Sequence, residues 1–286
     1  MQNPDRKPTP AIVFDSSLQD DVGKVLALAQ LLGCQARQEV RITSLSVSSN
    51  NLKSASFCDL MARFYGMTPS IGMALNVAPS ASVPPMVSAV LAKTTAEGKP
   101  AYNRTVEQLN DTADPVALIR NALTAQQDQN SVVVLAGPPV SLMGLLALPE
   151  GRKLIQKKVR MLVIAAPVDA KLLAEWPSPT LLAGEELGEA FPFPGAAIEE
   201  DFAWAPTHPL VDAYRAAKTM PYDAPSAAMA AVLHAAHPEE NYFKISEPAG
   251  RPRQLIVDPS QKDRILQAYR QAVSAKPLER RGLRGA

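Results

Sequence analysis

Hydrophobic positions along the chain fall into two kinds of run. Short apolar or β-rich segments predict strands, and longer segments with apolar residues at helical spacing separate them. We expect strands at 11–14, 41–47, 69–73, 131–136, 159–165 and 180–183.

The intervening segments carry recognisable helix signals. Asp114 and Pro115 predict an N-cap followed by the first helical residue, and Gly66 predicts a glycine just after a helix end. The segment 76–103 is rich in Pro, Ser and Ala, which predicts a loop with one or two helical turns. Helices are expected at 22–32, 54–65, from 115 onward, and at 169–176, 209–217, 226–236 and 263–275.

Apolar strands that alternate with helices indicate the α/β class. We expect an open, mostly parallel sheet with helices on both faces. Residues 242–256 are expected to add a small antiparallel C-terminal extension. Residues 1–276 are predicted to form a single domain, and the basic tail 277–286 is predicted to be disordered.

The composition of the chain limits the kinds of molecule that the protein is expected to bind. The formal charge of +1 gives no electrostatic reason to expect nucleic acid or an anionic membrane as a partner. No apolar stretch approaches the length of a membrane-spanning helix, and the first ten residues lack a signal-peptide core. We expect a cytoplasmic protein, or a secreted or periplasmic one if a signal peptide has been removed. Cys34 and Cys58 lie in apolar helical patterns and are expected to be buried free thiols.

Candidate chemistry concentrates at residues 12–33, IVFDSSLQDDVGKVLALAQLLG, where a strand turns into a helix through small and acidic residues. Ligands bind at the carboxyl ends of strands in open parallel sheets. Asp15 is therefore a candidate general base, and Ser17, Asn50 and Asn51 are candidate ligand-binding residues. Asp20 and Asp21 predict either metal ligands or a helix cap that compensates the helix dipole.

Other catalytic motifs are missing from the sequence. It contains no G-x-S-x-G elbow, no glycine-rich phosphate loop, no C-x-x-C and no His–Glu metal spacing. His208 and His237 each precede a proline and predict turn residues, and His234 predicts a core or boundary histidine on an apolar helix.

The opening motif resembles that of the inosine–uridine-preferring nucleoside hydrolase family, D-T-D-x-G-N-D-V-D-D-A-L-A-L. The ungapped match of FDSSLQDDVGKVLAL retains Asp15, Asp21, Val22, Leu26, Ala27 and Leu28. Further segments are similar in the same order, namely SLSVSSNN, VVVLAGPPVSLMGLL, WPSPTLLAGEELGEAF, HPLVDAYRA and MPYDAPSAAMAAVLHAA. The resemblance covers most of the chain and implies the fold described above.

The resemblance also implies a site that this chain has altered. The family holds one Ca²⁺ with first-loop aspartates, a strand-end carbonyl and a late aspartate, and the ion binds ribose hydroxyls and activates the attacking water. The corresponding positions here are Asp15, Ser17, Gly23, Lys24, Ala136 and Ala228. Ca²⁺ needs six to eight oxygen ligands. The family's E-F-N segment also has no counterpart, so we expect no metal and no cofactor.

Two functions remain open. The first is a nucleoside hydrolase homologue that has lost Ca²⁺-dependent N-glycosidic hydrolysis and binds a nucleoside, another ribose-like ligand or a protein partner. The second is an active N-ribohydrolase. It either binds Ca²⁺ through Asp20 and Asp21, which a one-residue deletion in the first loop brings onto the family's aspartate pair, or works without a metal and uses Asp15 as general base. The resemblance implies a possible homo-oligomer in either case.

Lys24 introduces a cation at one of the aspartate positions. We expect its ammonium to pair with Asp15 or Asp20 in place of the metal, or else to face water on the outer side of the helix.

Overall fold

The structure is a computed structural model that describes residues 8–19, 21–80, 82–246 and 252–277. Within this part of the chain, eight strands form one sheet with the order β3-β2-β1-β4-β5-β6-β8-β7. All neighbouring strands are parallel except β7 and β8. The strands are β1 (Ala11–Ser16), β2 (Arg41–Val47), β3 (Ile71–Met73), β4 (Ser131–Ala136), β5 (Val159–Ile164), β6 (Thr180–Leu182), β7 (Lys244–Ile245) and β8 (Arg253–Ile256).

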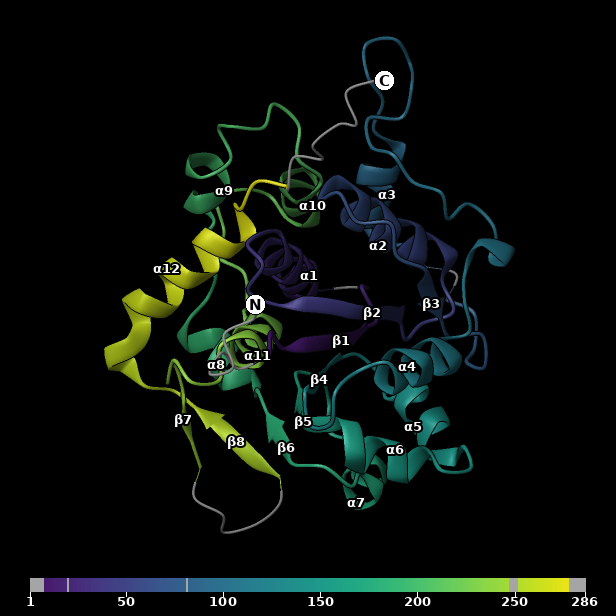
Figure 1. Ribbon diagram of the computed structural model, residues 1–286. Coiled ribbons are helices and arrows are strands. Elements are labelled where there is room, and N and C mark those ends of the chain that lie inside the picture. The colour runs from purple at the N-terminus through teal and green to yellow at the C-terminus, as the bar shows by residue number, and fades with distance from the viewer. Residues whose placement is uncertain (1–7, 20, 81, 247–251, 278–286) are drawn as a thin grey trace, which may run out of the picture.

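Helices cover both faces of this sheet, as Figure 1 shows. They are α1 (Val22–Ala36), α2 (Leu52–Phe64), α3 (Pro85–Ala92), α4 (Pro115–Thr124), α5 (Val140–Ala147), α6 (Gly151–Lys158), α7 (Ala170–Glu175), α8 (Glu185–Ala190), α9 (Ala196–Glu200), α10 (Pro209–Ala217), α11 (Ala227–Ala236) and α12 (Lys262–Val273), with short 3₁₀ turns at Leu109–Asp111 and Pro259–Gln261. The predicted fold class is confirmed.

Two hydrophobic clusters lie on opposite faces of the sheet. Successive side chains of a strand point to opposite faces. Ile12 and Phe14 of β1 accordingly join the cluster formed with α1–α3 and α8–α12, whereas Val13 joins the cluster formed with α4–α7. Continuous apolar strands are therefore needed, because both sides of each central strand are buried.

The predicted helix boundaries are confirmed where capping chemistry is strong. Asp114 caps α4, and its carboxylate accepts a hydrogen bond from the Ala117 amide at 2.6 Å, with Pro115 in the first helical position. Gly66 follows the end of α2 with a φ of 81°, in the left-handed region that glycine tolerates. The proline-rich loop 76–103 contains the expected helical turns as α3.

Some elements differ from the sequence prediction. Strand β1 extends to Ser16 instead of ending at Phe14, because Asp15 and Ser16 pair with β2 on one side and β4 on the other. Helices α5, α6, α8 and α9 were not predicted. Few of their residues are buried, which leaves α6, for example, with only Gly151 and Ile155 as buried positions.

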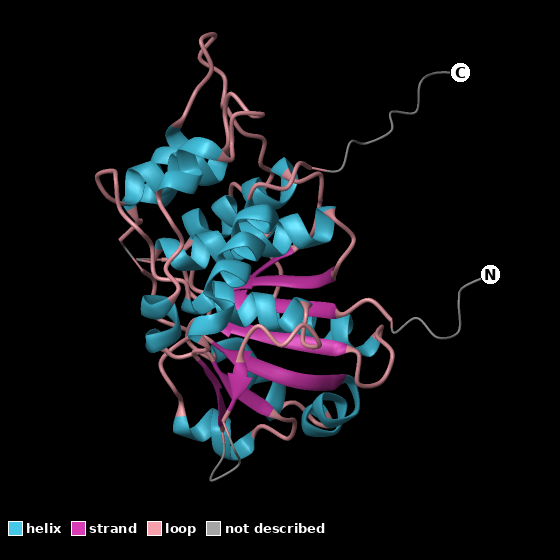
Figure 2. Ribbon diagram, turned by 90° about the vertical axis from the view of Figure 1, so that its left-hand side faces the viewer, coloured by secondary structure: helices cyan, strands magenta, loops and turns pink. Residues whose placement is uncertain are grey.

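The carboxyl ends of the central strands meet at one edge, and Figure 2 shows their arrowheads pointing the same way. Asp15 lies beside Leu135, and Ser16 lies beside Ala136. Asp15 and Ala136, two of the positions that the sequence resemblance singles out, therefore lie together at this edge. Most of the predicted tail, residues 278–286, lies outside the described residues.

Candidate functional site

The side chain of Asp15 is fully buried near the carboxyl end of β1. Both of its carboxylate oxygens lack a hydrogen-bond partner among the described residues. Burial raises the pKa of Asp15 to about 6, and the hydroxyls of Ser141 and Ser46 nearby lower it in part. A carboxyl with this pKa can accept or hold a proton near neutral pH.

The loops after β1 and β4 are packed directly against each other. The Ala136 carbonyl accepts hydrogen bonds from the Ser16 hydroxyl at 3.3 Å and the Ser17 amide at 3.5 Å. A Cβ added at Gly137 would overlap the Ser48 hydroxyl oxygen and lie 2.6 Å from the Ser17 amide nitrogen. Glycine is therefore required there by close backbone approach.

Lys24, in the first turn of α1, reaches back over this packed loop. Its ammonium donates a hydrogen bond to the Ser17 hydroxyl at 3.1 Å, and the Ser49 hydroxyl donates to the Ser17 carbonyl at 3.2 Å. Lys24 does not pair with Asp15, the first of its two expected partners: Lys24 is bound to Ser17, while Asp15 is enclosed between β2 and β4. Asp20, the other expected partner, lies outside the described residues.

Asp21 is the N-cap of α1, where its carboxylate accepts a hydrogen bond from the Gly23 amide at 2.7 Å. A Cβ added at Gly23 would overlap the carbonyl oxygen of Pro225, so the segment before α11 rests on the start of α1. Ala228 is buried in the first turn of α11. The backbone of Pro225 thus occupies space beside Gly23 that a side chain would need.

The two candidate asparagines hold a neighbouring loop. The Asn50 amide donates to the carbonyls of Leu75 and Val77, at 3.5 and 3.1 Å. Asn51 caps α2 and also donates to the Ser82 carbonyl at 2.9 Å. Both side chains therefore fix the loop that leads to α3.

A cavity of about 340 Å³ opens next to the start of α1. Tyr222 lines it, and its ring stacks on Tyr214 with a centroid distance of 4.4 Å. Reciprocal hydrogen bonds from each tyrosine hydroxyl to the other's carbonyl, at 2.7 and 2.6 Å, hold the pair rigidly. The remaining lining residues are Asp21, Val22, Pro84, Pro85, Met86, Ala217, Lys218, Asp223 and Pro225.

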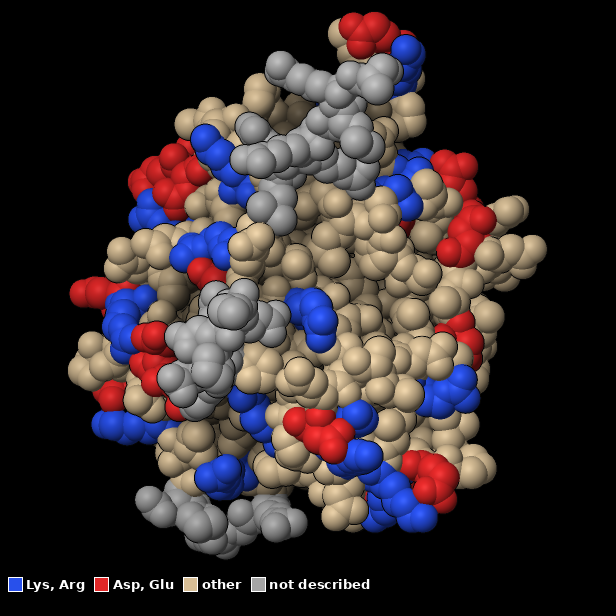
Figure 3. Space-filling model, in the orientation of Figure 1, with Lys and Arg blue, Asp and Glu red and all other residues tan. Residues whose placement is uncertain are grey.

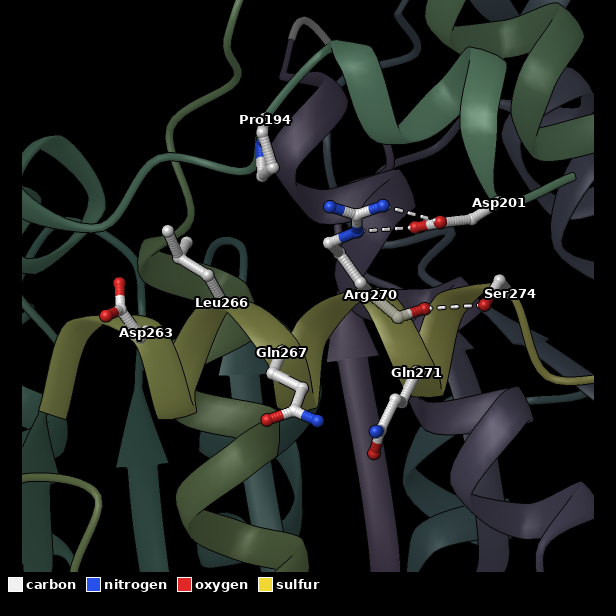
Figure 4. A pocket seen from close by; sticks show the side chains of 8 residues that line it. All are labelled: Pro194, Asp201, Asp263, Leu266, Gln267, Arg270, Gln271 and Ser274. Atoms are coloured by element: carbon white, nitrogen blue, oxygen red, sulfur yellow. Dashed lines mark hydrogen bonds and ion pairs between the residues drawn. The ribbon is translucent and has the colours of Figure 1, made fainter.

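A larger groove of about 530 Å³ runs along α12 and receives no residue from the strand-end loops. Figure 4 shows Arg270 directed at Asp201 across this groove. Its guanidinium donates to the two carboxylate oxygens of Asp201 at 2.7 and 2.6 Å. Arg270 is therefore already paired with Asp201, and its charge is not free to bind an anionic ligand in this groove.

The three histidines belong to α10 and α11. His208 is the buried N-cap of α10, and burial lowers its pKa to about 3. His234 is buried on α11 as predicted, and burial together with Arg160 and Arg253 lowers its pKa to about 4. His237 is the C-cap of α11, with its Nε2 3.3 Å from the Glu39 carboxylate.

The surface gives no single-sign region on the face shown in Figure 3, where basic and acidic side chains are interspersed. In the part of the chain that the structure describes, no helix has the length and apolar character to span a bilayer.

Sequence reasoning did not identify Ser46, Ser141, Tyr222 or Asp223 as neighbours of the site. The first two surround Asp15 because their elements meet it in space, and the last two line the cavity. The dipeptide Tyr222-Asp223 lies in a proline-rich segment and matches no motif with a defined spacing, so it is only a weak signal of a binding site.

Comparison with known proteins adds the fold class. No protein-family model matches the chain, and no curated protein matches it in sequence. A purine-preferring ribonucleoside hydrolase from Gardnerella vaginalis aligns in structure at 12% identity with a TM-score of 0.66, covering 94% of this chain and 99% of that one. An inosine-uridine preferring nucleoside hydrolase from Bacillus anthracis aligns at 14% identity with a TM-score of 0.64, covering 93% and 99%.

A third similar structure is the type III effector protein XopQ complexed with adenosine diphosphate ribose. It aligns at 13% identity with a TM-score of 0.66, covering 96% of this chain and 94% of XopQ. The chain therefore has the nucleoside hydrolase fold over almost its whole length, as the sequence resemblance implied.

Proposed function

We propose that this protein is a divergent homologue of the nucleoside hydrolases that has lost Ca²⁺-dependent hydrolysis of the N-glycosidic bond and binds a nucleoside or another ribose-like ligand. The shared fold, which spans almost the full length of the hydrolases, supports the family. The hydrogen bond between Lys24 and Ser17 is the observation that most directly supports the loss of Ca²⁺-dependent hydrolysis.

The oxygens at the old metal positions do not fit Ca²⁺. Asp15 supplies a carboxylate, but the Ser17 hydroxyl accepts a hydrogen bond from the Lys24 ammonium, and the Ala136 carbonyl accepts two hydrogen bonds from Ser16 and Ser17. Ca²⁺ needs six to eight oxygen ligands, several of them anionic. A cation placed beside a neutral hydroxyl opposes that ion electrostatically.

The cavity beside α1 suits a ribose-like ligand. The carboxylates of Asp21 and Asp223 can accept hydrogen bonds from vicinal hydroxyls, and the fixed ring of Tyr222 offers an aromatic surface. Its volume of about 340 Å³ lies in the range of small-molecule sites. The ADP-ribose bound by the structurally similar XopQ supports this class of ligand.

The alternative is an active N-ribohydrolase, and one observation favours it. The buried, unpartnered carboxylate of Asp15 has a pKa of about 6, which suits a general base. Asp21 caps α1, so a Ca²⁺-dependent form of this alternative requires Asp21 to give up its cap, whereas a metal-free form that uses Asp15 as base does not. Homo-oligomer formation and a cytoplasmic location stay predictions.

Ligand binding and calorimetry test the proposal. Inosine or ADP-ribose is expected to raise the melting temperature without Ca²⁺, and Ca²⁺ calorimetry is expected to show no binding in the micromolar range. Asp223→Asn should weaken ligand binding, whereas Asp263→Asn, the same change in the groove of α12, should not. Release of free base from inosine that Asp15→Asn abolishes would establish the enzyme instead.

A further inference from the structure

Cys34, Glu39 and His237 lie together at the amino edge of the sheet, away from Asp15. Glu39 comes two residues before β2 begins, whereas Asp15 lies near the opposite end of the adjacent strand β1. One sulfur, one carboxylate oxygen and one imidazole nitrogen from these residues all lie within 4.8 Å of one another. Among the described residues, this is the group of three such side chains that comes close enough to share an ion.

The end of α1 brings Cys34 and Glu39 together. The Gln38 amide donates to the Gln35 carbonyl at 3.0 Å and the Glu39 amide donates to the Cys34 carbonyl at 2.9 Å, which is the bonding pattern of a Schellman motif. Gln38 adopts the left-handed conformation that this motif requires, with a φ of 61°. Two apolar side chains usually meet at the positions that Cys34 and Glu39 occupy.

The third side chain comes from a different helix end. His237 is the C-cap of α11, which packs against α1. Its Nε2 lies 3.3 Å from Oε2 of Glu39. Two packed helices therefore end at the same point, and each contributes a metal-binding type of side chain there.

We propose that Cys34, Glu39 and His237 form a binding site for a divalent transition metal ion of the zinc class. Thiolate, imidazole and carboxylate are the ligands that Zn²⁺ takes in proteins. Ligand atoms of a tetrahedral zinc site lie about 3.3–3.6 Å apart, since metal–ligand bonds are about 2.0–2.3 Å long. The pair formed by His237 and Glu39 already has this separation, and the Cys34 sulfur lies within 4.8 Å of both.

Arg37 orients the carboxylate for this role. Its Nε lies 2.7 Å from Oε1 of Glu39, which directs Oε2 toward His237. Partners of this kind around metal ligands set ligand orientation and tune affinity. The charges of Arg37, one divalent ion, a thiolate and a carboxylate leave a small net charge.

The exposure of the three side chains suits an accessible ion. Cys34 is 1% exposed, whereas the side chains of His237 and Glu39 are 26% and 22% exposed. An ion can therefore enter from solvent on the side of His237 and Glu39. Without a metal ion the Cys34 thiol donates a hydrogen bond to Glu39, whereas a metal ion would take the sulfur as a thiolate ligand, so the state of Cys34 distinguishes the two arrangements.

Cobalt and zinc titrations test the site on the full chain after treatment with a chelator. Co²⁺ is expected to bind with one equivalent per chain and to give a near-ultraviolet thiolate-to-metal band that Zn²⁺ removes. Cys34→Ser should abolish the band, and His237→Ala should weaken binding at least 10-fold. Cys58→Ser, which changes the other buried thiol, should leave both unchanged.

Two results would overturn the site. One is the absence of a thiolate band in the wild-type protein. The other is a Zn²⁺ affinity that His237→Ala leaves unchanged, a measurement that stands even if Cys34→Ser fails to fold, because His237 is part-exposed at a helix end.

Discussion

A carboxylate without a partner inside a sheet costs free energy, and Asp15 is such a group. Burial raises its pKa from 3.8 to about 6, so the native state keeps a proton that the unfolded chain has released. The free energy of unfolding should therefore fall as pH rises from 3.8 through about 6, and stay at the lower value above that.

Asp15→Asn removes this dependence, since an amide does not titrate. Relative to wild type, the variant should gain about 3 kcal/mol between pH 3 and pH 7.5, an order-of-magnitude figure from the shift of about two pKa units. Urea denaturation of both proteins across this range measures the difference, in which other titrating groups cancel. A constant difference between the two proteins would mean that the folded and unfolded pKa values of Asp15 are equal, and a change of the opposite sign would mean that a cation pairs with it.

The hydrogen bond between Lys24 and Ser17 gives a second residue-scale prediction. Lys24→Ala should destabilise by about 1 kcal/mol, and Ser17→Ala by a similar amount. The double variant should cost less than the sum, because both single changes remove the same bond. Full additivity in a denaturation cycle would show that Lys24 faces water.

For single residues, the sequence predicted the place of a side chain in a helix or loop better than the residue with which that side chain interacts. Asp21 was recognised as a possible cap from its place before an apolar helix, because capping is a local interaction. The partner of Lys24 in the structure, Ser17, was not among the partners expected from the sequence, because a long flexible side chain can reach several neighbouring oxygens. The cluster of Cys34, Glu39 and His237 could not be predicted from the sequence, because His237 lies about 200 residues from the other two.

Among the elements, α10 depends on an unusual cap. The Nδ1 of His208 accepts a hydrogen bond from the Leu210 amide at 3.2 Å, so the imidazole must be neutral to cap the helix. Phe64, Phe202 and Trp204 surround the ring with their edges or faces. The sequence predicted a turn residue here, and the residue does mark a boundary, as the start of a helix.

Acid should therefore weaken the protein through His208. Its folded pKa of about 3 lies below the ordinary 6.5, so the unfolded chain binds the proton first and stability falls as pH decreases below 6.5. Wild type should lose about 2 kcal/mol relative to His208→Asn between pH 7.5 and pH 5, since asparagine caps without titrating. Thermal or urea unfolding at both pH values measures this, and equal losses in the two proteins would contradict it.

Helices and strands could be predicted from the sequence where their burial requires a clear pattern of apolar residues. The strands β4 and β5 are apolar along most of their length because both sheet faces are covered, and their positions were found. The helix α6 was missed because it presents only Gly151 and Ile155 to the core. The short helix α9 has too few residues to show a period.

Across the whole molecule, the two ends of the sheet differ in metal chemistry. At the carboxyl edge, the Lys24 ammonium is bound to Ser17 and the loops after β1 and β4 are closely packed. At the amino edge, a thiol, an imidazole and a carboxylate converge. The oxygen ligands that Ca²⁺ prefers and the thiolate and imidazole ligands that Zn²⁺ prefers would thus lie at opposite ends of the strands. One experiment that compares the two ions can therefore test both edges.

Melting temperatures measured with each ion should separate the two edges. Ca²⁺ should leave the melting temperature unchanged if, as we propose, the calcium site has been lost. Zn²⁺ at 100 times its dissociation constant should stabilise by about 2.7 kcal/mol if it binds only the folded chain. Cys34→Ser should remove the zinc effect, and Lys24→Ala should not alter it. A rise with Ca²⁺ that Asp15→Asn abolishes would instead place a working calcium site at the carboxyl edge, and with it the active hydrolase.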